Sequence, residues 1–165
     1  MTKSMDDLRA AFAGESQANR KYTAFGRKAD LEGFTQVAKL FRAAAAAETV
    51  HALSHFTALG GVLSTKENLE AAIAGENYEV VTMYPEFIKD AESEGAKPAL
   101  RSFKWAYEVE KVHEQLYREA LATLGQTTEI YDYYICPVCG YTVGKGAPAN
   151  CPVCGTLGSK FERIS

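Results

Sequence analysis

The chain has 165 residues, enough for one full hydrophobic core and a small appended module. Its formal net charge is −3, and acidic and basic residues are mixed along the sequence, which argues against nucleic acid and anionic membranes as partners. No apolar run approaches the ~20 residues of a membrane span, and the N-terminus lacks the apolar core of a signal peptide, so we expect a cytoplasmic protein.

Four long helical stretches are predicted ahead of a tail that is rich in Cys, Gly and Pro. The first stretch has Ser4 as its N-cap and continues, with apolar residues at helical spacing, to Gly33. The second stretch runs from about Phe34 to Leu59 and stops at a glycine doublet. Gly33 is therefore the turn between two antiparallel helices.

The third stretch begins with the capping-box pattern Ser64-x-x-Glu67 and ends near Gly95. The fourth stretch has Pro98 in its first turn and is closed by Gly125. Beyond a polar connector, the tail contains no pattern of helix length. Its turn-forming Gly and Pro, mixed with Tyr, Val and Ile, predict short strands and loops.

Two short patterns occur twice in the helical part. Gly14-Glu15 recurs 61 residues later as Gly75-Glu76, and Glu48-Thr49-Val50-His51 recurs 62 residues later as Glu110-Lys111-Val112-His113. Residues 5–60 and 66–125 therefore read as two copies of one helical hairpin. Each copy supplies one Glu and one Glu-x-x-His.

This inventory predicts a carboxylate-and-imidazole cage for two metal ions. Residues three apart in a helix project from one face, and four-helix di-iron and di-manganese proteins combine two Glu with two Glu-x-x-His motifs. Measured from the turns, the candidate groups fall at similar depth near mid-bundle, where buried carboxylates need cations. Hard oxygen ligands with imidazoles favour iron or manganese over zinc. The candidates are Glu15, Glu48, His51, Glu76, Glu79, Glu110 and His113.

Some of these candidates also have a plainer interpretation. A single Glu-x-x-His in a charged helix is usually surface chemistry, and only its repetition at matched depth favours metal. His55 lies near the Glu48 face, where an outer or core histidine is favoured over a ligand. Glu79 stands where the first copy has Ala18, so it is either a solvated helix residue or a ligand. Its position one turn after Glu76 favours the site and would make the two metal shells unequal.

All four cysteines lie in two Cys-x-x-Cys pairs, which in a reducing compartment favours metal ligation over disulfides. Cys136 and Cys139 form one knuckle, Cys151 and Cys154 form the other, and the two can close a tetrahedral site. Structural zinc would hold a tail that is too small to fold alone, whereas a single iron would be a one-electron carrier. The spacing leaves these two metals equally open.

Together these residues resemble the rubrerythrin family over nearly the whole chain. The helical part is similar to the family in residues 13–18, 47–51, 75–79, 83–87 and 110–113. The tail resembles a shortened rubredoxin, with its Cys-Pro-x-Cys-Gly-Tyr knuckle. The resemblance implies a mainly α protein with a ferritin-like di-iron four-helix domain at 1–125, a connector at 126–132 and a rubredoxin-like FeS4 domain of short β-strands at 133–165.

The resemblance also implies an oxidoreductase. The family reduces hydrogen peroxide to water at a non-haem di-iron centre, which protects against oxidative stress. Electrons would reach the oxo- or carboxylate-bridged centre from the FeS4 site, so the tail metal becomes iron. Rubredoxin and an NAD(P)H-dependent reductase would be the electron donors.

Residue roles follow from the same resemblance. Glu48 and Glu110 would bridge the two irons. One iron would be bound by Glu15 and His51, and the other by Glu76 and His113. Glu79 would exchange with His51 as a ligand of one iron on reduction. Tyr22 and Tyr84 match tyrosines that hydrogen-bond the cage, although a Tyr at helical spacing is more often plain core.

The length of the central connector predicts a swapped homodimer. In the ferritin-like arrangement the second and third helices point the same way, so their link returns along a helix of about 25 residues, ~37 Å. Residues 60–64 reach only ~17 Å. We therefore expect helices one and two of one subunit to complete a bundle with helices three and four of another. Glu48 and Glu110 of one chain on one metal pair would contradict this and leave an up-down-up-down bundle within one chain.

Three rival functions use parts of the same inventory. A ferritin-class ferroxidase or iron-storage protein would share the cage, but storage needs no terminal electron carrier. A zinc-binding module with a helical scaffold leaves the buried carboxylates unexplained. An oxygen-reducing oxidase would use the same ferrous pair, so its reactivity with peroxide and oxygen has to be compared.

Overall fold

The computed structural model describes residues 2–126 and 129–165. Positions 127 and 128 of the predicted connector 126–132 lie outside the described residues. The chain forms two compact units, residues 1–63 and 64–165. The first unit is a helical hairpin, and the second is a helical hairpin joined to a small sheet.

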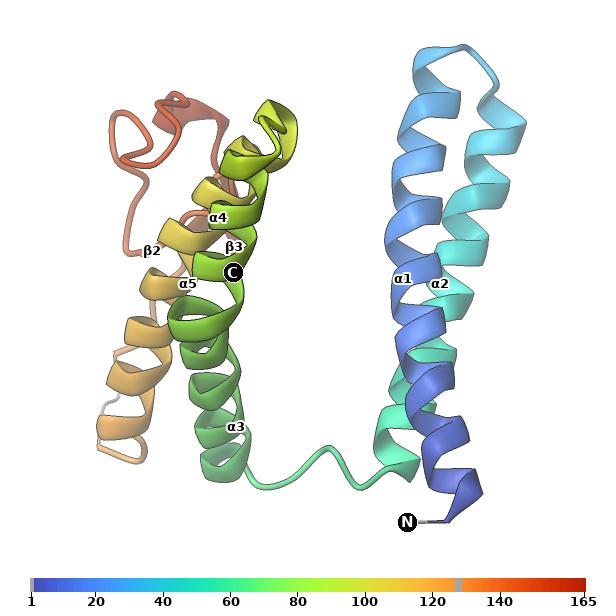
Figure 1. The fold of residues 1–165 in the computed structure, drawn as a ribbon, viewed down its shortest axis with the longest axis horizontal. Helices are drawn as coiled ribbons and strands as arrows, with labels where there is room; N and C mark the ends of the chain where they lie inside the picture. Colours follow the sequence, from blue (N-terminus) through green and yellow to red (C-terminus); the bar gives the residue numbers. More distant parts are fainter. Residues whose placement is uncertain (1, 127–128) are drawn as a thin grey trace. The chain divides into compact units, whose positions relative to one another are not determined.

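The first unit consists of α1 (Lys3–Leu31) and α2 (Thr35–Ala58), which run side by side in opposite directions (Figure 1). Gly33 makes the turn between them with a φ of +83°, a conformation that a side chain would strain. The expected N-cap Ser4 was wrong. The helix begins earlier, and Thr2 occupies the N-cap position without a side-chain hydrogen bond.

The two helices of this hairpin approach closely because small residues line their contact. Ala38, Ala45 and Ala52 are buried at a seven-residue spacing along α2, which places them on one stripe of that helix. Gly26 of α1 faces the same stripe, and a Cβ atom there would lie 3.5 Å from the Ala38 carbonyl oxygen. This seam fixes the relative height of the two helices.

In the second unit, α3 (Thr65–Tyr78), η1 (Glu79–Met83) and α4 (Tyr84–Ser93) form one arm, and α5 (Lys97–Ala122) forms the other. The predicted capping box is confirmed: Ser64 Oγ accepts a hydrogen bond from Glu67 N, and Ser64 N donates to Glu67 Oε2 at 3.1 Å. Pro98 lies in the first turn of α5, as predicted. The third stretch runs to the turn near Gly95 as predicted, but it is not α-helical throughout, because η1 is a π-helical turn.

The π-helical turn has a cause that can be read in the repeat. Before η1 the two hairpins match at an offset of 61, as in Glu15 and Glu76. After η1 they match at 62, as in Tyr22 and Tyr84. The second copy thus carries one extra residue, and a π-helical turn absorbs one residue while the helix continues on the same course.

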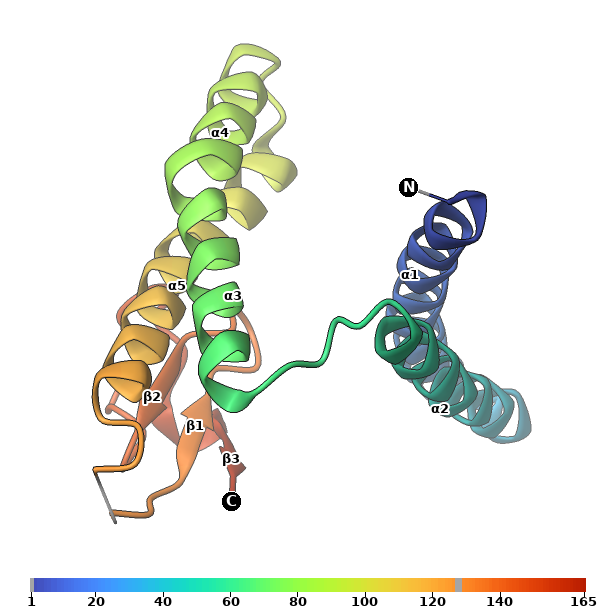
Figure 2. The ribbon, with the colours of Figure 1, turned by 90° about the horizontal axis from the view of Figure 1, so that it is seen from below.

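The tail folds into the predicted short strands. They are β1 (Tyr133–Ile135), β2 (Thr142–Gly144) and β3 (Glu162–Ile164), in the antiparallel order β2-β1-β3, with the 3₁₀ turn η2 (Gly158–Lys160) before the last strand. Figure 2 shows this sheet beside α5, and β2 contacts that helix. The contact joins the tail to the second hairpin. Among the described residues, no helix is long and apolar enough to cross a membrane.

Candidate metal centres

Three groups of side chains bring possible ligand atoms within 4.8 Å of one another among the described residues. The groups are Glu15, Glu48 and His51; Glu76, Glu110 and His113; and Cys136, Cys139, Cys151 and Cys154. The first belongs to the first unit and the other two belong to the second unit. Glu79 is the one predicted ligand that joins none of these groups.

The first group lies across α1 and α2. The ring nitrogen Nδ1 of His51 lies 2.9 Å from Glu48 Oε2, one helical turn away on the same face. Hydrogen bonds from His51 and Glu15 lower the pKa of the Glu48 carboxyl. The His51 side chain is 56% exposed, whereas Glu15 and Glu48 are half-buried, so within the first unit the histidine is the most exposed ligand of this group.

A buried amide holds the two helices in register beside the first group. Asn19 donates from Nδ2 to the Ala45 carbonyl oxygen at 2.6 Å and to Thr49 Oγ1 at 2.7 Å. Thr49 directly follows Glu48, so this pair of hydrogen bonds fixes α1 against α2 at the depth of the carboxylates. Asn19 was not singled out from the sequence, where a polar residue in a charged helix gives no indication of burial.

The second group has the same geometry at its histidine. Nδ1 of His113 lies 2.7 Å from Glu110 Oε2, and this hydrogen bond is the main reason that the pKa of His113 is raised. Burial and the charge of Glu110 raise the pKa of Glu76 to about 7. A divalent cation among these groups would replace the shared protons and remove the repulsion between the carboxylates.

Glu79 and Tyr84 flank the second group. Burial, followed by the charge of Glu110, raises the pKa of Glu79. The same two causes raise the pKa of the Tyr84 phenol, so its hydroxyl stays protonated next to three carboxylates. Tyr84 therefore has a proton to donate towards the cluster, whereas Glu79 lies outside the clustered ligands.

The predicted tyrosines also belong to two matching aromatic clusters. Tyr22 packs with Phe25 and Phe41 on the first hairpin, and the corresponding cluster on the second hairpin is Tyr84, Phe87 and Phe103. All three pairs are 62 residues apart. Phe41 and Phe103 were missed in the sequence, although the repeat offset contained the information. His55 is half-buried on α2 and joins none of the three groups among the described residues.

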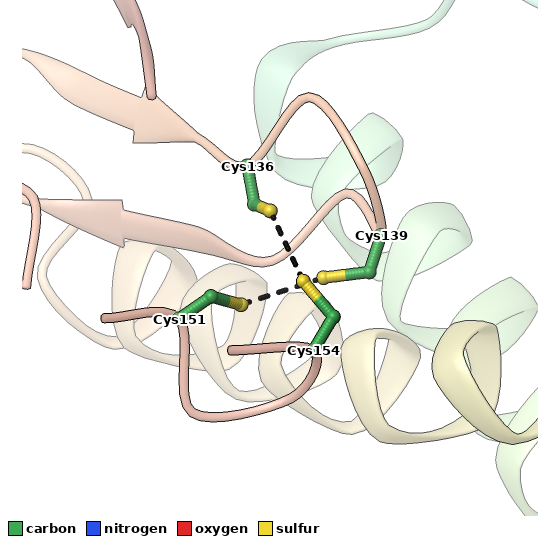
Figure 3. A group of neighbouring side chains, drawn as sticks. All are labelled: Cys136, Cys139, Cys151 and Cys154. Atoms are coloured by element: carbon green, nitrogen blue, oxygen red, sulfur yellow. Dashed lines mark hydrogen bonds between the residues drawn. The ribbon is translucent and has the colours of Figure 1, made fainter. Parts of the chain in front are cut away.

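The four cysteines converge between the two knuckles (Figure 3). All four are free thiols, and Cys136 and Cys151 are almost completely buried. Sγ of Cys136 lies 3.5 Å from that of Cys154, and Sγ of Cys139 lies 3.5 Å from that of Cys151. A tetrahedral ion with metal–sulfur bonds of about 2.3 Å has sulfur–sulfur edges of about 3.8 Å, so the cage fits one ion.

Each knuckle closes on a glycine with positive φ. Gly140 at +87° donates its N–H to the Cys136 carbonyl oxygen, and Gly155 at +78° donates to the Cys151 carbonyl oxygen. These turns aim both sulfurs of a pair inwards. Burial raises the pKa of Cys139. For Cys154 burial acts in the same direction, but hydrogen bonds from Thr156 outweigh it and lower the pKa to about 6.

Paired helical hairpins with carboxylate–histidine groups, followed by a four-thiolate knuckle domain, define a class of helical non-haem metal proteins with a rubredoxin-type module. The rubrerythrin family model matches residues 6–121, and the model of the rubrerythrin rubredoxin-like domain matches residues 134–162. The chain therefore belongs to the rubrerythrin family.

Relatives match along almost the entire chain. It is 35% identical to rubrerythrin-2 of Clostridium acetobutylicum over 95% of this chain and 94% of that protein. It is 39% identical to a rubrerythrin of Porphyromonas gingivalis over 98% of this chain and 90% of that protein. The fully reduced, all-ferrous structure of nigerythrin superimposes with a TM-score of 0.60 at 31% identity, over 99% of this chain and 88% of that one.

The fold of the family is thus shown: a mainly α four-helix bundle with a small three-stranded, cysteine-rich domain. The donor sets agree with this placement. Two groups of carboxylates with imidazole suit two iron ions, and four thiolates suit a single rubredoxin-type iron.

Proposed function

We propose that this protein is a peroxidase that reduces hydrogen peroxide to water with electrons relayed from its four-cysteine site. The observation that carries the proposal is the presence, in one chain, of two carboxylate–histidine groups and a four-thiolate site. Reduction of one peroxide consumes two electrons and two protons and yields two waters. A storage protein has no use for the third site, so its presence favours a redox enzyme.

The ligand roles are proposed residue by residue from the family resemblance. Glu48 and Glu110 bridge, and each lies beside the histidine one turn further along its helix. Glu15 and Glu76 complete the two groups. Glu79, which stands outside the groups, is the carboxylate that would exchange with His51 when the centre changes its redox state.

When bound, the two irons supply the electrons for cleaving the O–O bond and act as Lewis acids. The chain supplies the protons and the surroundings. A tyrosine hydroxyl is protonated at neutral pH, and burial together with the charges of Glu110, Glu79 and Glu76 raises the pKa of Tyr84 further. Tyr84 is therefore the proposed donor of hydrogen bonds to the leaving hydroxide.

The test is rapid-mixing absorbance on the anaerobically reduced, iron-loaded protein, mixed in parallel with hydrogen peroxide and with dioxygen. If the protein is a peroxidase, we expect the red colour of the ferric four-cysteine site to return quickly with peroxide and slowly with oxygen. Faster recovery with oxygen would establish an oxidase or ferroxidase instead. A protein that never becomes red would hold zinc in the tail, and the relay would be excluded.

We also propose that the working unit is a helix-swapped homodimer. Each hairpin supplies three clustered ligands among the described residues. The connector of residues 59–64 spans at most about 20 Å when fully extended, which is shorter than the ~37 Å that it would have to cover to return along a helix of about 25 residues within one chain. The first hairpin also carries large apolar side chains that are at least 45% exposed: Phe25, Leu31, Phe34, Val37, Leu40, Val50 and Leu53. Such a surface needs a partner hairpin.

Complementation separates a swapped dimer from a bundle within one chain. Glu48→Ala and Glu110→Ala chains are produced together and, as controls, separately. In a swapped dimer the mixed pair contains one intact and one doubly altered site, so random pairing restores about a quarter of the wild-type activity. A bundle within one chain restores none.

The electron donors form the last part of the proposal. Rubredoxin and an NAD(P)H-dependent reductase are expected to reduce the four-cysteine site from outside. NAD(P)H consumption with peroxide, measured with and without added rubredoxin, tests this directly. A rate that does not depend on added rubredoxin would exclude it as the donor.

A further inference from the structure

Thr142 joins the second carboxylate–histidine group to the cysteine knuckle. It is the first residue of β2, and its hydroxyl oxygen lies 3.0 Å from Nε2 of His113 on α5. The same oxygen donates a hydrogen bond to the Gly140 carbonyl oxygen at 3.0 Å. Neither contact is required by the fold of the sheet, because both involve the side chain of Thr142.

These two contacts determine which ring nitrogen of His113 carries a proton. A threonine hydroxyl has one proton, and a carbonyl oxygen can only accept. Thr142 gives its proton to Gly140, whose carbonyl oxygen also accepts from the His113 ring and raises its pKa, so both groups beside Nε2 act as acceptors of its proton. The opposite nitrogen, Nδ1, shares a proton with Glu110 in the metal-free chain, and a metal ion bound between them would replace that proton and take up the Nδ1 lone pair.

The same hydrogen bonds lead to a cysteine ligand over a short stretch of backbone. Gly140 directly follows Cys139, and its own N–H is bonded to the Cys136 carbonyl oxygen at 3.0 Å. The path from His113 to the knuckle therefore consists of two hydrogen bonds and one peptide unit. His51 has a different environment: among the described residues of its own hairpin, its ring is hydrogen-bonded to Glu48 through Nδ1 and has no partner at Nε2.

We propose that Thr142 is a positioning residue that holds His113 as the Nε2–H tautomer and couples this half of the dinuclear site to the four-cysteine site of the same chain. The electron-relay consequence rests on the proposed function. In the relay one electron leaves the four-cysteine site, which is oxidised, and the dinuclear site is reduced. No atom is transferred. The electron would enter the dinuclear site on the side of His113.

The surroundings of the contact make Thr142 open to substitution. A cavity of about 410 Å³ borders it and is lined by Leu69, His113, Leu116, Tyr117, Ala120, Tyr133, Ile135 and Thr142. Thr142→Val keeps the shape of the side chain and removes only the hydroxyl, while Thr142→Ser keeps the hydroxyl. Val has the same number of heavy atoms as Thr and Ser has one fewer, and the bordering cavity leaves room for the methyl group of Val, so the tail is expected to fold in both variants.

The first test needs no turnover. In the full-length chain loaded with Zn²⁺, NMR measures how fast the Nε2 proton of His113 exchanges with water. We expect Thr142→Val to accelerate this exchange by up to about tenfold, the factor that corresponds to the loss of one hydrogen bond, and Thr142→Ser to stay close to wild type. Equal exchange in wild type and Thr142→Val would overturn the proposal.

The second test follows the return of the red colour after peroxide in the iron-loaded protein. Thr142→Val should slow it about tenfold without shifting the reduction potential of the four-cysteine site, because Thr142 bonds no sulfur. Thr156→Val should shift that potential, since Thr156 bonds Sγ of Cys154 at 3.1 Å. Thr123→Val, whose hydroxyl bonds only the helix carbonyl of Glu119, should change neither quantity.

The outcomes distinguish this inference from the proposed function. A shifted potential in Thr142→Val would place its effect in the knuckle and overturn the assignment to His113. An unchanged rate of colour return in Thr142→Val would overturn the coupling. If the wild type itself does not respond to peroxide, both the proposed function and the electron relay are excluded. The exchange rate of the Nε2 proton of His113 would still test the positioning role of Thr142.

Discussion

The two hairpins are copies of one unit, yet they treat the same ligands differently. In the first hairpin a continuous α1 carries Glu15, and His51 is exposed. In the second hairpin a π-helical turn begins at Glu79, and His113 is held on both ring nitrogens. The repeat supplies matching ligands, and the additions to the second copy supply the asymmetry between the two sites.

The carboxylates of the two groups also differ, although the two whose pKa values shift most clearly are not corresponding positions of the repeat. Hydrogen bonds lower the pKa of Glu48 in the first group, whereas burial and the charge of Glu110 raise the pKa of Glu76 to about 7 in the second. A bound cation would therefore relieve more repulsion between carboxylates in the second group than in the first. Duplication alone does not produce this difference. In the second group it comes mainly from burial of Glu76 and then from the charge of Glu110, and the extra carboxyl of Glu79 adds a smaller contribution.

The largest expected effect tests whether the two groups form one site. Glu48→Ala and Glu110→Ala should each remove iron from both groups and lower peroxidase activity more than about 100-fold, beyond the effect of losing an outer partner. Iron content per chain and the steady-state rate measure this. Glu108→Ala, an exposed change on α5 that breaks only a pair with Lys111, is the matched control. Loss of iron from one group alone would indicate two independent sites.

The next prediction concerns the extra residue. Deleting Val81, which is exposed within η1, should turn the π-helical turn into α-helix and leave the aromatic cluster around Tyr84 intact. Deleting the exposed Lys21 from the continuous α1 should rotate Tyr22 away from Phe41 and cost about 3 kcal/mol or more. Denaturant unfolding measures both. Equal costs would contradict the interpretation of η1 as an inserted residue.

A smaller effect is expected at the buried amide of the first hairpin. The second hairpin has Val80 at the position of Asn19. Asn19→Val should destabilise the protein by about 1–3 kcal/mol, because Thr49 and the Ala45 carbonyl lose a buried hydrogen-bond donor. Gln17→Ala, an exposed change on the same helix, should stay within about 0.5 kcal/mol. Unfolding free energies of the two variants decide the matter.

The smallest effect is on the pH dependence of the metal-free protein. Because the pKa of Glu76 is raised from 4.5 to about 7, its protonated form stabilises the fold fully below pH 4.5, and this contribution is lost as the pH rises through 7. The melting temperature should fall by a few degrees between pH 5 and 8, and Glu76→Gln should flatten the part of that decline below pH 6.5, whereas the raised pKa of His113 contributes a further decline above pH 6.5 in both proteins.

Glu48 supplies the opposite sign. Its pKa is lowered, so its contribution is present above pH 4.5 and is lost on acidification. Glu48→Gln should therefore change only the acid side of the melting profile. A decline between pH 5 and 6.5 that survives in Glu76→Gln would show that a group other than Glu76 is responsible.

Much of this arrangement could be predicted from the sequence because it depends on local spacing. The helix limits follow from Ser64, Pro98 and the turn glycines, and the clustered ligands follow from Glu-x-x-His and Cys-x-x-Cys. These motifs bring groups together within one or two turns of chain. Their geometry therefore needs no knowledge of tertiary contacts.

The remaining features depend on contacts between distant segments. Thr142 meets His113 across 29 positions, and Asn19 meets Ala45 across 26, so neither partner can be named from its neighbours in sequence. The π-helical turn is a middle case. The offsets of 61 and 62 were visible in the sequence, but only the backbone shows where the extra residue lies.

The extra residue also orders events in the history of the chain. At the moment of duplication, both copies had the same length and therefore one constant offset. The change from 61 to 62 within η1 must therefore be younger than the duplication, whichever copy gained or lost a residue. The backbone of the two halves has thus diverged as well as their side chains, and at the very helix that carries the unmatched carboxylate, Glu79.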